Sequence, residues 1–163
     1  MTAGSTLLTT WETLQMRRQI SFTAILIGTL AVSGCVKAFP GDQKLPEDLF
    51  KAARQSERAP VGFHDDLRRK SCGQVTLDQG EQIPADAVEC MDSAIGHLDA
   101  ELAIVSLTTE GDPIVVFYRT STGTPGVETF TDGEFDRYGP KTWTHQNCPE
   151  TTTLTSLHGC SEI

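Results

Sequence analysis

Basic residues are scarce in the C-terminal part of this chain. From Cys72 to Ile163 there are three lysines and arginines against fifteen aspartates and glutamates, a net charge of −12. Nucleic-acid binding needs basic side chains for the phosphates, so we expect no nucleic-acid partner. The acidic surface favours solubility and repulsion from anionic lipid, and a cationic partner is the functional alternative.

Common catalytic and nucleotide-binding motifs are also missing. The chain has no Walker A loop, no HExxH pair and no dinucleotide-binding glycine pattern. Ser106 and Ser121 lack the neighbouring glycines of a nucleophile elbow. These gaps indicate a protein that is not an enzyme and that uses no cofactor or metal.

The clearest apolar run, Ile20–Val32, is too short to span a membrane, which takes about 20 apolar residues. Arg17 and Arg18 precede the run and small residues follow it, so residues 16–34 are typical of an export signal. Ala31–Cys35 resembles the bacterial lipobox, which implies a diacylglyceryl group on Cys35 and cleavage before it. The protein would then be lipid-anchored on the extracytoplasmic face of the cell membrane. An ordinary secretory signal, or a membrane anchor with a chance cysteine, is the alternative.

The sequence around this signal suggests three further parts. Residues 1–15 are polar and carry no basic residue, so we expect them to be a misassigned extension, with translation starting at Met16. Residues 35–71 are rich in charge and proline and are expected to form a tether. A short helix beginning at Pro46 would either dock on the domain or stay mostly disordered. Residues 72–163 are expected to form one globular domain.

Four cysteines remain beyond Cys35, an even number that points to disulfides in an exported domain. Three pairings are possible, and we favour the sequence-local one, Cys72 with Cys90 and Cys148 with Cys160. Each bridge would close a short loop, worth about 3 kcal/mol in the chain-entropy model.

The hydrophobic pattern from Gln74 onward predicts one main helix and several strands. Pro84 opens the helix, which is expected to run from Ala85 to about Ala100 with an apolar stripe on one face. The expected strands cover Gln74–Leu77, Leu102–Leu107, Ile114–Tyr118, Val127–Thr131, Thr142–His145 and, less clearly, Thr151–Leu157. We therefore expect an α+β fold: an antiparallel meander of four to five strands, stapled by disulfides, with the helix packed on one face.

Several short motifs lie between Cys72 and Cys160: Cys72-Gly73, Gln79-Gly80-Glu81, Pro84, Cys90, Thr108–Pro113 and the C-terminal cysteine pair. Together they resemble those of small exported lipoproteins of high-GC Gram-positive bacteria. This family has no assigned function, so the resemblance implies a small exported domain and offers no activity to transfer.

Two residue clusters could carry chemistry. His145, Cys148, His158 and Cys160 could hold zinc, although oxidation of the thiols to a disulfide is favoured outside the cell. Asp132, Glu134 and Asp136 could serve acid–base hydrolysis or bind calcium, although Asp132-Gly133 is typical of a turn.

The function expected from the sequence is a noncatalytic, membrane-anchored module that binds an envelope protein or a cell-wall component. Two alternatives stay open. One is a small envelope hydrolase using Asp132, Glu134 and Asp136, and the other is an inhibitor of an exported enzyme.

Overall fold

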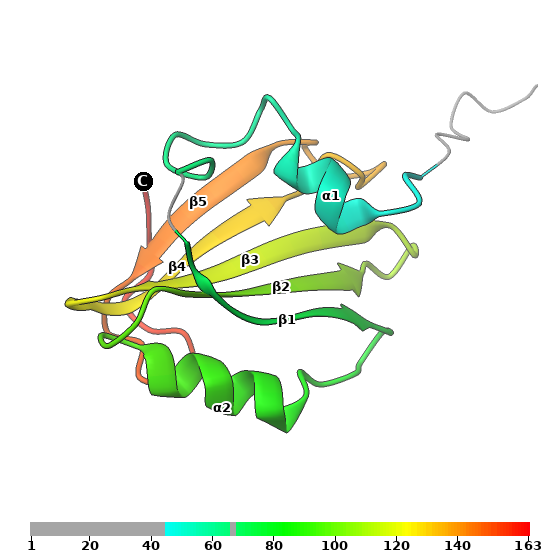
Figure 1. Ribbon diagram of the computed structural model, residues 1–163. Helices are drawn as coiled ribbons and strands as arrows, with labels where there is room; N and C mark the ends of the chain where they lie inside the picture. Colours follow the sequence, from blue (N-terminus) through cyan, green and yellow to red (C-terminus); the bar gives the residue numbers. More distant parts are fainter. Residues whose placement is uncertain (1–44, 66–67) are drawn as a thin grey trace, which may run out of the picture. The chain divides into compact units, whose positions relative to one another are not determined.

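The computed structural model describes residues 45–65 and 68–163, and it forms an α+β fold around a single six-stranded sheet (Figure 1). In chain order the elements are α1 (Leu49–Arg54), β1 (Lys70–Leu77), α2 (Ala85–Ala94), β2 (Ala100–Leu107), β3 (Pro113–Ser121), β4 (Thr124–Asp132), β5 (Trp143–Cys148) and β6 (Ser161–Glu162). The strands lie in the sheet in the same order as in the chain.

The expected all-antiparallel meander is wrong at its first strand. β1 pairs with β2 in parallel, from Lys70 opposite Ala100 to Leu77 opposite Ser106, whereas every later pair is antiparallel. A parallel pair needs a crossover of a dozen or more residues, and α2 lies in that crossover. The helix therefore connects β1 to β2, and it packs on one face of the sheet as expected.

The main helix ends earlier than the apolar stripe predicted. α2 stops at Ala94, and Gly96 follows with a φ of +72°, the left-handed conformation in which helices commonly end. The chain then enters β2 at Ala100, inside the stretch expected to be helical.

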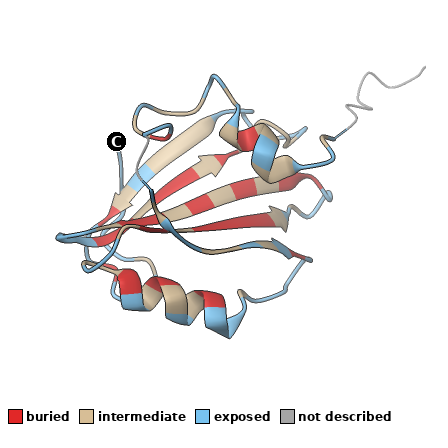
Figure 2. Cartoon of the chain, in the orientation of Figure 1, coloured by how far each residue is buried: buried red, intermediate tan, exposed pale blue. Residues whose placement is uncertain are grey.

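The shorter helix, α1, lies on the face of the sheet opposite to α2 (Figure 1). Alternate residues of β2 face opposite ways: Leu102 and Ile104 pack with Met91 of α2, whereas Ala103 and Val105 pack in the cluster that contains Ala53 of α1. Figure 2 shows that the central strands carry most of the buried residues. The sheet therefore has a hydrophobic core on each side, where the sequence predicted one.

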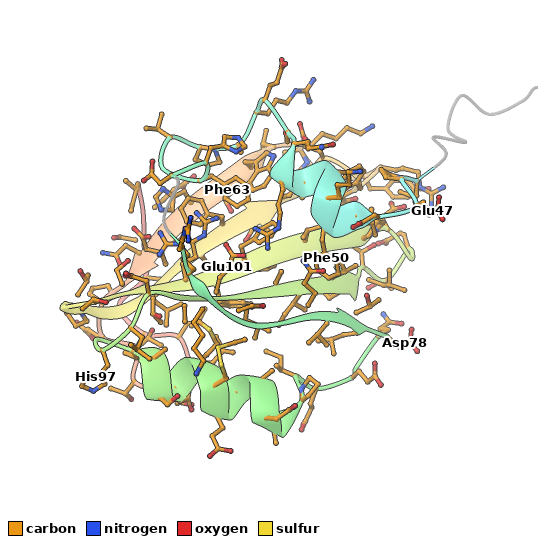
Figure 3. All side chains as sticks on the ribbon, viewed as in Figure 1. Glu47, Phe50, Phe63, Asp78, His97 and Glu101 are labelled. Atoms are coloured by element: carbon orange, nitrogen blue, oxygen red, sulfur yellow. A yellow bond between two sulfur atoms is a disulfide. The ribbon has the colours of Figure 1, made fainter. Side chains whose placement is uncertain are left out.

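Residues 45–65 thus belong in part to the folded unit, although residues 35–71 were expected to be a tether. Ala53 of α1 is fully buried, and Phe63, labelled in Figure 3, is only 3% exposed among Val115, Phe117 and Phe130. The expected boundary at Cys72 lies inside β1. Of the two outcomes left open for the short helix, the structure has the docked one.

The C-terminal segment closes the core on the α2 side. Thr151–Leu157 does not form the expected strand; it contains one isolated bridge, between Thr153 and Ser156. Its Leu154 is buried, and the Leu154 N–H donates to the Asp92 carboxylate of α2 at 2.7 Å. The last strand is instead the two-residue β6, beside β5.

Two disulfides are present, Cys72–Cys90 and Cys148–Cys160, which is the sequence-local pairing. Cys72–Cys90 joins the outer strand β1 to α2. Cys148–Cys160 joins β5 to the residues just before β6. Each bridge helps to hold an outer strand of the sheet, since β1 pairs with β2 alone and β6 pairs with β5 alone.

We expect the double substitution Cys72→Ser/Cys90→Ser to lower the free energy of unfolding by about 2–5 kcal/mol. This bridge fixes the principal helix to the sheet edge. Cys148→Ser/Cys160→Ser should mainly loosen residues 149–163, so native-state hydrogen exchange should rise there while the melting temperature falls less. An equal loss of melting temperature for the two variants would contradict this ranking.

Candidate anion-binding site

A carboxylate held between two guanidinium groups lies on the α1 face of the sheet. Glu101 on β2 and Arg119 on β3 are directly opposite in the antiparallel register. Arg119 Nε donates to Glu101 Oε2 at 2.8 Å, and the Arg54 guanidinium donates to Glu101 Oε1 at 2.5 Å. The Arg119 and Glu101 side chains are 5% and 11% exposed, so both charges lie largely out of water.

Arg119 also anchors the segment that precedes β1. Its terminal nitrogen donates to the backbone carbonyl of Phe63 at 2.8 Å and more weakly to that of Gly62 at 3.4 Å. The guanidinium lies 4.5 Å from the centre of the Phe63 ring and 4.8 Å from that of Phe130. Such cation–π contacts are worth up to about 2 kcal/mol when water is excluded. One buried side chain therefore ties residues 62–63 to the sheet.

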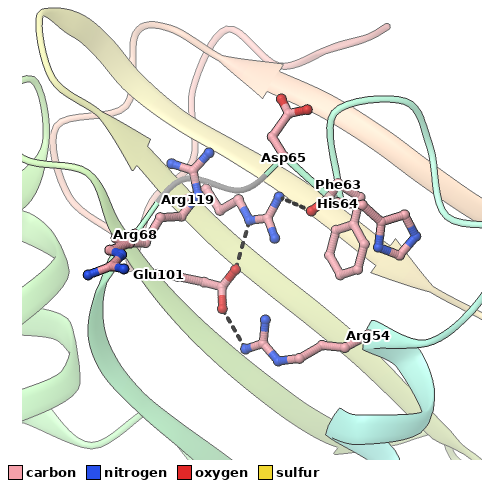
Figure 4. Close-up of a pocket in the computed structure, with 8 residues that line it drawn as sticks. Arg54, Phe63, His64, Asp65, Arg68, Glu101 and Arg119 are labelled. Atoms are coloured by element: carbon pink, nitrogen blue, oxygen red, sulfur yellow. Dashed lines mark hydrogen bonds and ion pairs between the residues drawn. The ribbon is translucent and has the colours of Figure 1, made fainter.

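These residues form one wall of an open hollow of about 490 Å³ (Figure 4). In Figure 4, Arg54 and Arg119 approach Glu101 from opposite sides, and Asp65 lies beyond Arg119. The described residues that line it are Arg54, Phe63, His64, Asp65, Arg68, Arg69, Glu101 and Arg119. Four guanidinium groups thus face two carboxylates, an excess of positive charge inside a strongly acidic domain.

The arginines of the hollow differ in how far they are already engaged. Arg69 donates to the carbonyl of Thr120 at 3.2 Å. Arg68 is exposed and has no hydrogen bond or ion pair with any residue in 45–65 or 68–163. Each oxygen of Glu101 accepts a hydrogen bond from Arg54 or Arg119, and neither Arg68 nor Arg69 pairs with this carboxylate. The hollow therefore keeps guanidinium donors for a ligand.

Two pKa shifts reflect this crowding of positive charge. Burial lowers the pKa of Arg119, and the nearby charges of Arg69 and Arg54 lower it further, against the opposing effect of Glu101. Burial alone would raise the pKa of Glu101, but hydrogen bonds and charges from Arg54 and Arg119 outweigh it and bring that pKa below its ordinary value. Glu101 is therefore ionised at neutral pH, and the arginines around it repel one another.

The carboxylates considered for hydrolysis lie elsewhere and have separate environments. Asp132 is fully buried on β4; one oxygen accepts the Glu134 N–H at 2.8 Å, and the other has no hydrogen-bond partner among the described residues. Glu134 pairs with Ser56 and Arg58. Asp136 accepts the backbone N–H groups of the turn at Tyr138 and Gly139. None of the three lines the arginine hollow.

Burial of Asp132 raises its pKa from 3.8 to about 6, and the charge of Glu134 adds to the rise while the Glu134 N–H opposes it. The folded state therefore binds this proton more tightly than the unfolded state. Ionised Asp132 destabilises the fold at neutral pH by on the order of 3 kcal/mol, and stability should rise as the pH falls from about 7 to about 4.

Asp132→Asn should raise the melting temperature at pH 7.5 and remove most of this rise on acidification, because the amide oxygen can still accept the Glu134 N–H. Thermal unfolding between pH 4.5 and pH 8 measures both effects. Asp136→Asn is the matched control, because an amide oxygen can also keep its turn hydrogen bonds. A variant whose melting temperature follows the same pH curve as the parent would contradict the assignment.

The structure places the candidate zinc ligands in other roles. Cys148 and Cys160 are bonded to each other, His145 stacks on Phe130 with ring centres 4.1 Å apart, and His158 contacts Ser156 at 2.9 Å. Among the described residues, no group of three or more histidine, cysteine or acidic side chains is arranged to hold a metal ion, zinc and calcium included.

Sequence reasoning missed the arginine hollow. Arg54, Arg68 and Arg69 fall within residues 35–71, which were expected to be a tether. Glu101 and Arg119 were not singled out. A signal was nevertheless present: Glu101 alternates with Ala103 and Val105, so a charged side chain occupies an inward position of its strand. A charge at such a position needs a buried partner from elsewhere in the chain.

Comparison with known proteins yields no match to a protein-family model, a curated protein or a solved structure. Within the described part of the chain, no helix has the length and apolar character needed to cross a membrane. The signal at residues 16–34 and the lipidation residue Cys35 lie outside the described residues. The resemblance to small exported lipoproteins stays a prediction.

Proposed function

We propose that this protein is a noncatalytic binding module of the cell envelope that takes an anionic ligand in the arginine hollow. A lipid on Cys35 would hold it at the extracytoplasmic face of the membrane, where the ligand belongs to an envelope protein or a cell-wall component. The excess of guanidinium groups in the hollow is the observation that carries the proposal.

The wider charge distribution supports a binding role. An acidic domain gains nothing for solubility by gathering four arginines in one place, and their mutual repulsion has to be offset within the fold. Arginine forks suit carboxylate and phosphate oxygens because they donate two parallel hydrogen bonds. The arrangement favours binding over hydrolysis, since no residue of the hollow forms a nucleophile–base pair.

Isothermal titration of the full chain, purified in neutral detergent, with sulfate tests this function. We expect saturable binding that weakens as chloride is raised. Arg68→Ala should weaken it, whereas Lys51→Ala, which removes a positive charge from α1 outside the hollow, should not. Equal binding by the parent and Arg68→Ala would contradict the proposed site.

The proposed anchor has a separate test. Cys35→Ser should leave an unprocessed precursor without lipid, because the thiol of Cys35 is the acceptor in the proposed lipidation. Metabolic labelling with a lipid analogue, followed by electrophoresis, measures this. Labelling that persists in Cys35→Ser would contradict the anchor and leave the binding site untouched.

A further inference from the structure

We infer that the group recognised in the arginine hollow is a phosphate monoester in its doubly charged form. This inference rests on the proposed function and adds the chemical class of the ligand. Among residues 45–65 and 68–163, those that line the hollow include four arginines and two carboxylates, Glu101 and Asp65. The difference is two positive charges, which a dianion neutralises and a single carboxylate does not.

The placement of the donors favours a tetrahedral group over a planar one. The guanidinium groups that solvent can reach come from separate places: Arg54, 38% exposed, from α1, and Arg68 and Arg69 from the approach to β1. A carboxylate has two oxygens in one plane, and Glu101 accepts one guanidinium group on each of them. A phosphate monoester has three terminal oxygens pointing in different directions and can accept from several arginines at once.

The hollow leaves room for a ligand larger than inorganic phosphate. Its volume of about 490 Å³ lies in the range of about 300–1,000 Å³ that is typical of small-molecule sites. Asp65 and His64 line the same hollow and are exposed. Asp65 has no ion pair with another described residue, so it disfavours further negative charge and can accept hydrogen bonds from hydroxyl groups. The phosphate therefore carries a neutral, hydroxyl-bearing substituent.

Glycerol 3-phosphate is the soluble probe for this class, with succinate and sulfate for comparison. At pH 7.5 we expect the full chain in neutral detergent to bind glycerol 3-phosphate at least tenfold more tightly than succinate. Arg68→Ala should weaken glycerol 3-phosphate binding by about tenfold or more, the loss of one charge-assisted contact. Lys51→Ala should bind as the parent does, and Asp65→Asn should bind more tightly.

The pH dependence separates a dianion from other ligands. The second pKa of a phosphate monoester is about 6, so its affinity should fall as the pH is lowered from 7.5 to 5. Sulfate keeps two negative charges over this pH range, so any change in its affinity with pH reports titration of the protein itself. Glycerol 3-phosphate binding that follows the sulfate curve would overturn the inference.

Two negative outcomes have different meanings. If succinate binds as tightly as glycerol 3-phosphate in an Arg68-dependent way, the phosphate assignment fails and the anion-binding function stands. If none of the three probes binds, both proposals fail. These outcomes are read from the same titrations on the same protein.

A second arm identifies the source of the phosphate. The full chain is reconstituted in vesicles of phosphatidylcholine alone or with phosphatidic acid, and glycerol 3-phosphate binding is measured in each. Competition by phosphatidic acid, absent in Arg68→Ala, assigns the site to a lipid headgroup. Unchanged affinity assigns it to a soluble or wall-borne phosphate.

Discussion

Glu101→Gln should destabilise the fold by about 3–5 kcal/mol, because it leaves the buried Arg119 guanidinium without a counter-charge. Arg119 is 5% exposed and packed against the rings of Phe63 and Phe130, so it cannot turn to water without breaking its bonds to residues 62 and 63. The loss is a large share of the 5–15 kcal/mol that typically stabilises a domain. Urea-induced unfolding measures it.

Glu110→Gln is the matched control, since it removes an equal charge from an exposed turn and should change stability by less than about 0.5 kcal/mol. Glu101→Gln combined with Arg119→Met should recover much of the loss, because no buried charge is then left unpaired. The pH dependence has a defined sign. The pKa of Glu101 is lowered from 4.5 in the fold, so its stabilisation is complete above that pH and is lost as the pH falls below it. If Glu101→Gln were as stable as the parent at pH 7, the described role of Glu101 between Arg54 and Arg119 would be contradicted.

Phe63→Ala should cost about 3–5 kcal/mol, the usual effect of truncating a buried aromatic residue. The Phe63 ring is 3% exposed and packs 4.9 Å from Phe117 and 4.8 Å from Trp143, measured between ring centres. It also supports the Arg119 guanidinium, so anion binding should weaken together with stability. Thermal and urea unfolding measure the first effect, and sulfate titration measures the second.

Val61→Ala is the control for this segment, because Val61 is 98% exposed and only two residues away. Its melting temperature should match that of the parent. If residues 45–65 were a free tether in solution, Phe63→Ala would behave in the same way as Val61→Ala. That equality is the result that would contradict the packing described for this segment.

Local sequence signals predicted much of this fold. The strands around Glu110–Pro113 were expected because two β-rich runs flank strong turn residues, and the structure has a β2–β3 hairpin there. The proline at position 84 and the apolar stripe after it gave the start of α2. These features depend on residues close in the sequence, where propensity and periodicity act directly.

Features that depend on distant contacts were not predictable in the same way. The parallel pairing of β1 with β2 depends on how α2, which connects them, packs against both strands. α1 has only a narrow apolar stripe, and its docking relies on Arg54 meeting Glu101, 47 residues further along the chain. The arginine hollow arises from the same long-range contacts. Composition and spacing alone do not show that its residues lie close together.

The central claim is that the arginine hollow binds an anion, and arginine side-chain NMR tests it most directly. The full chain in neutral detergent is titrated with glycerol 3-phosphate while the Nε–Hε signals of all arginines are followed, each assigned by a single substitution. We predict saturable shifts for Arg68, Arg69, Arg54 and Arg119, and none for Arg58, which pairs with Glu134 outside the hollow. Small shifts spread evenly over every arginine, or larger shifts at Arg58 than at Arg68, would contradict the claim.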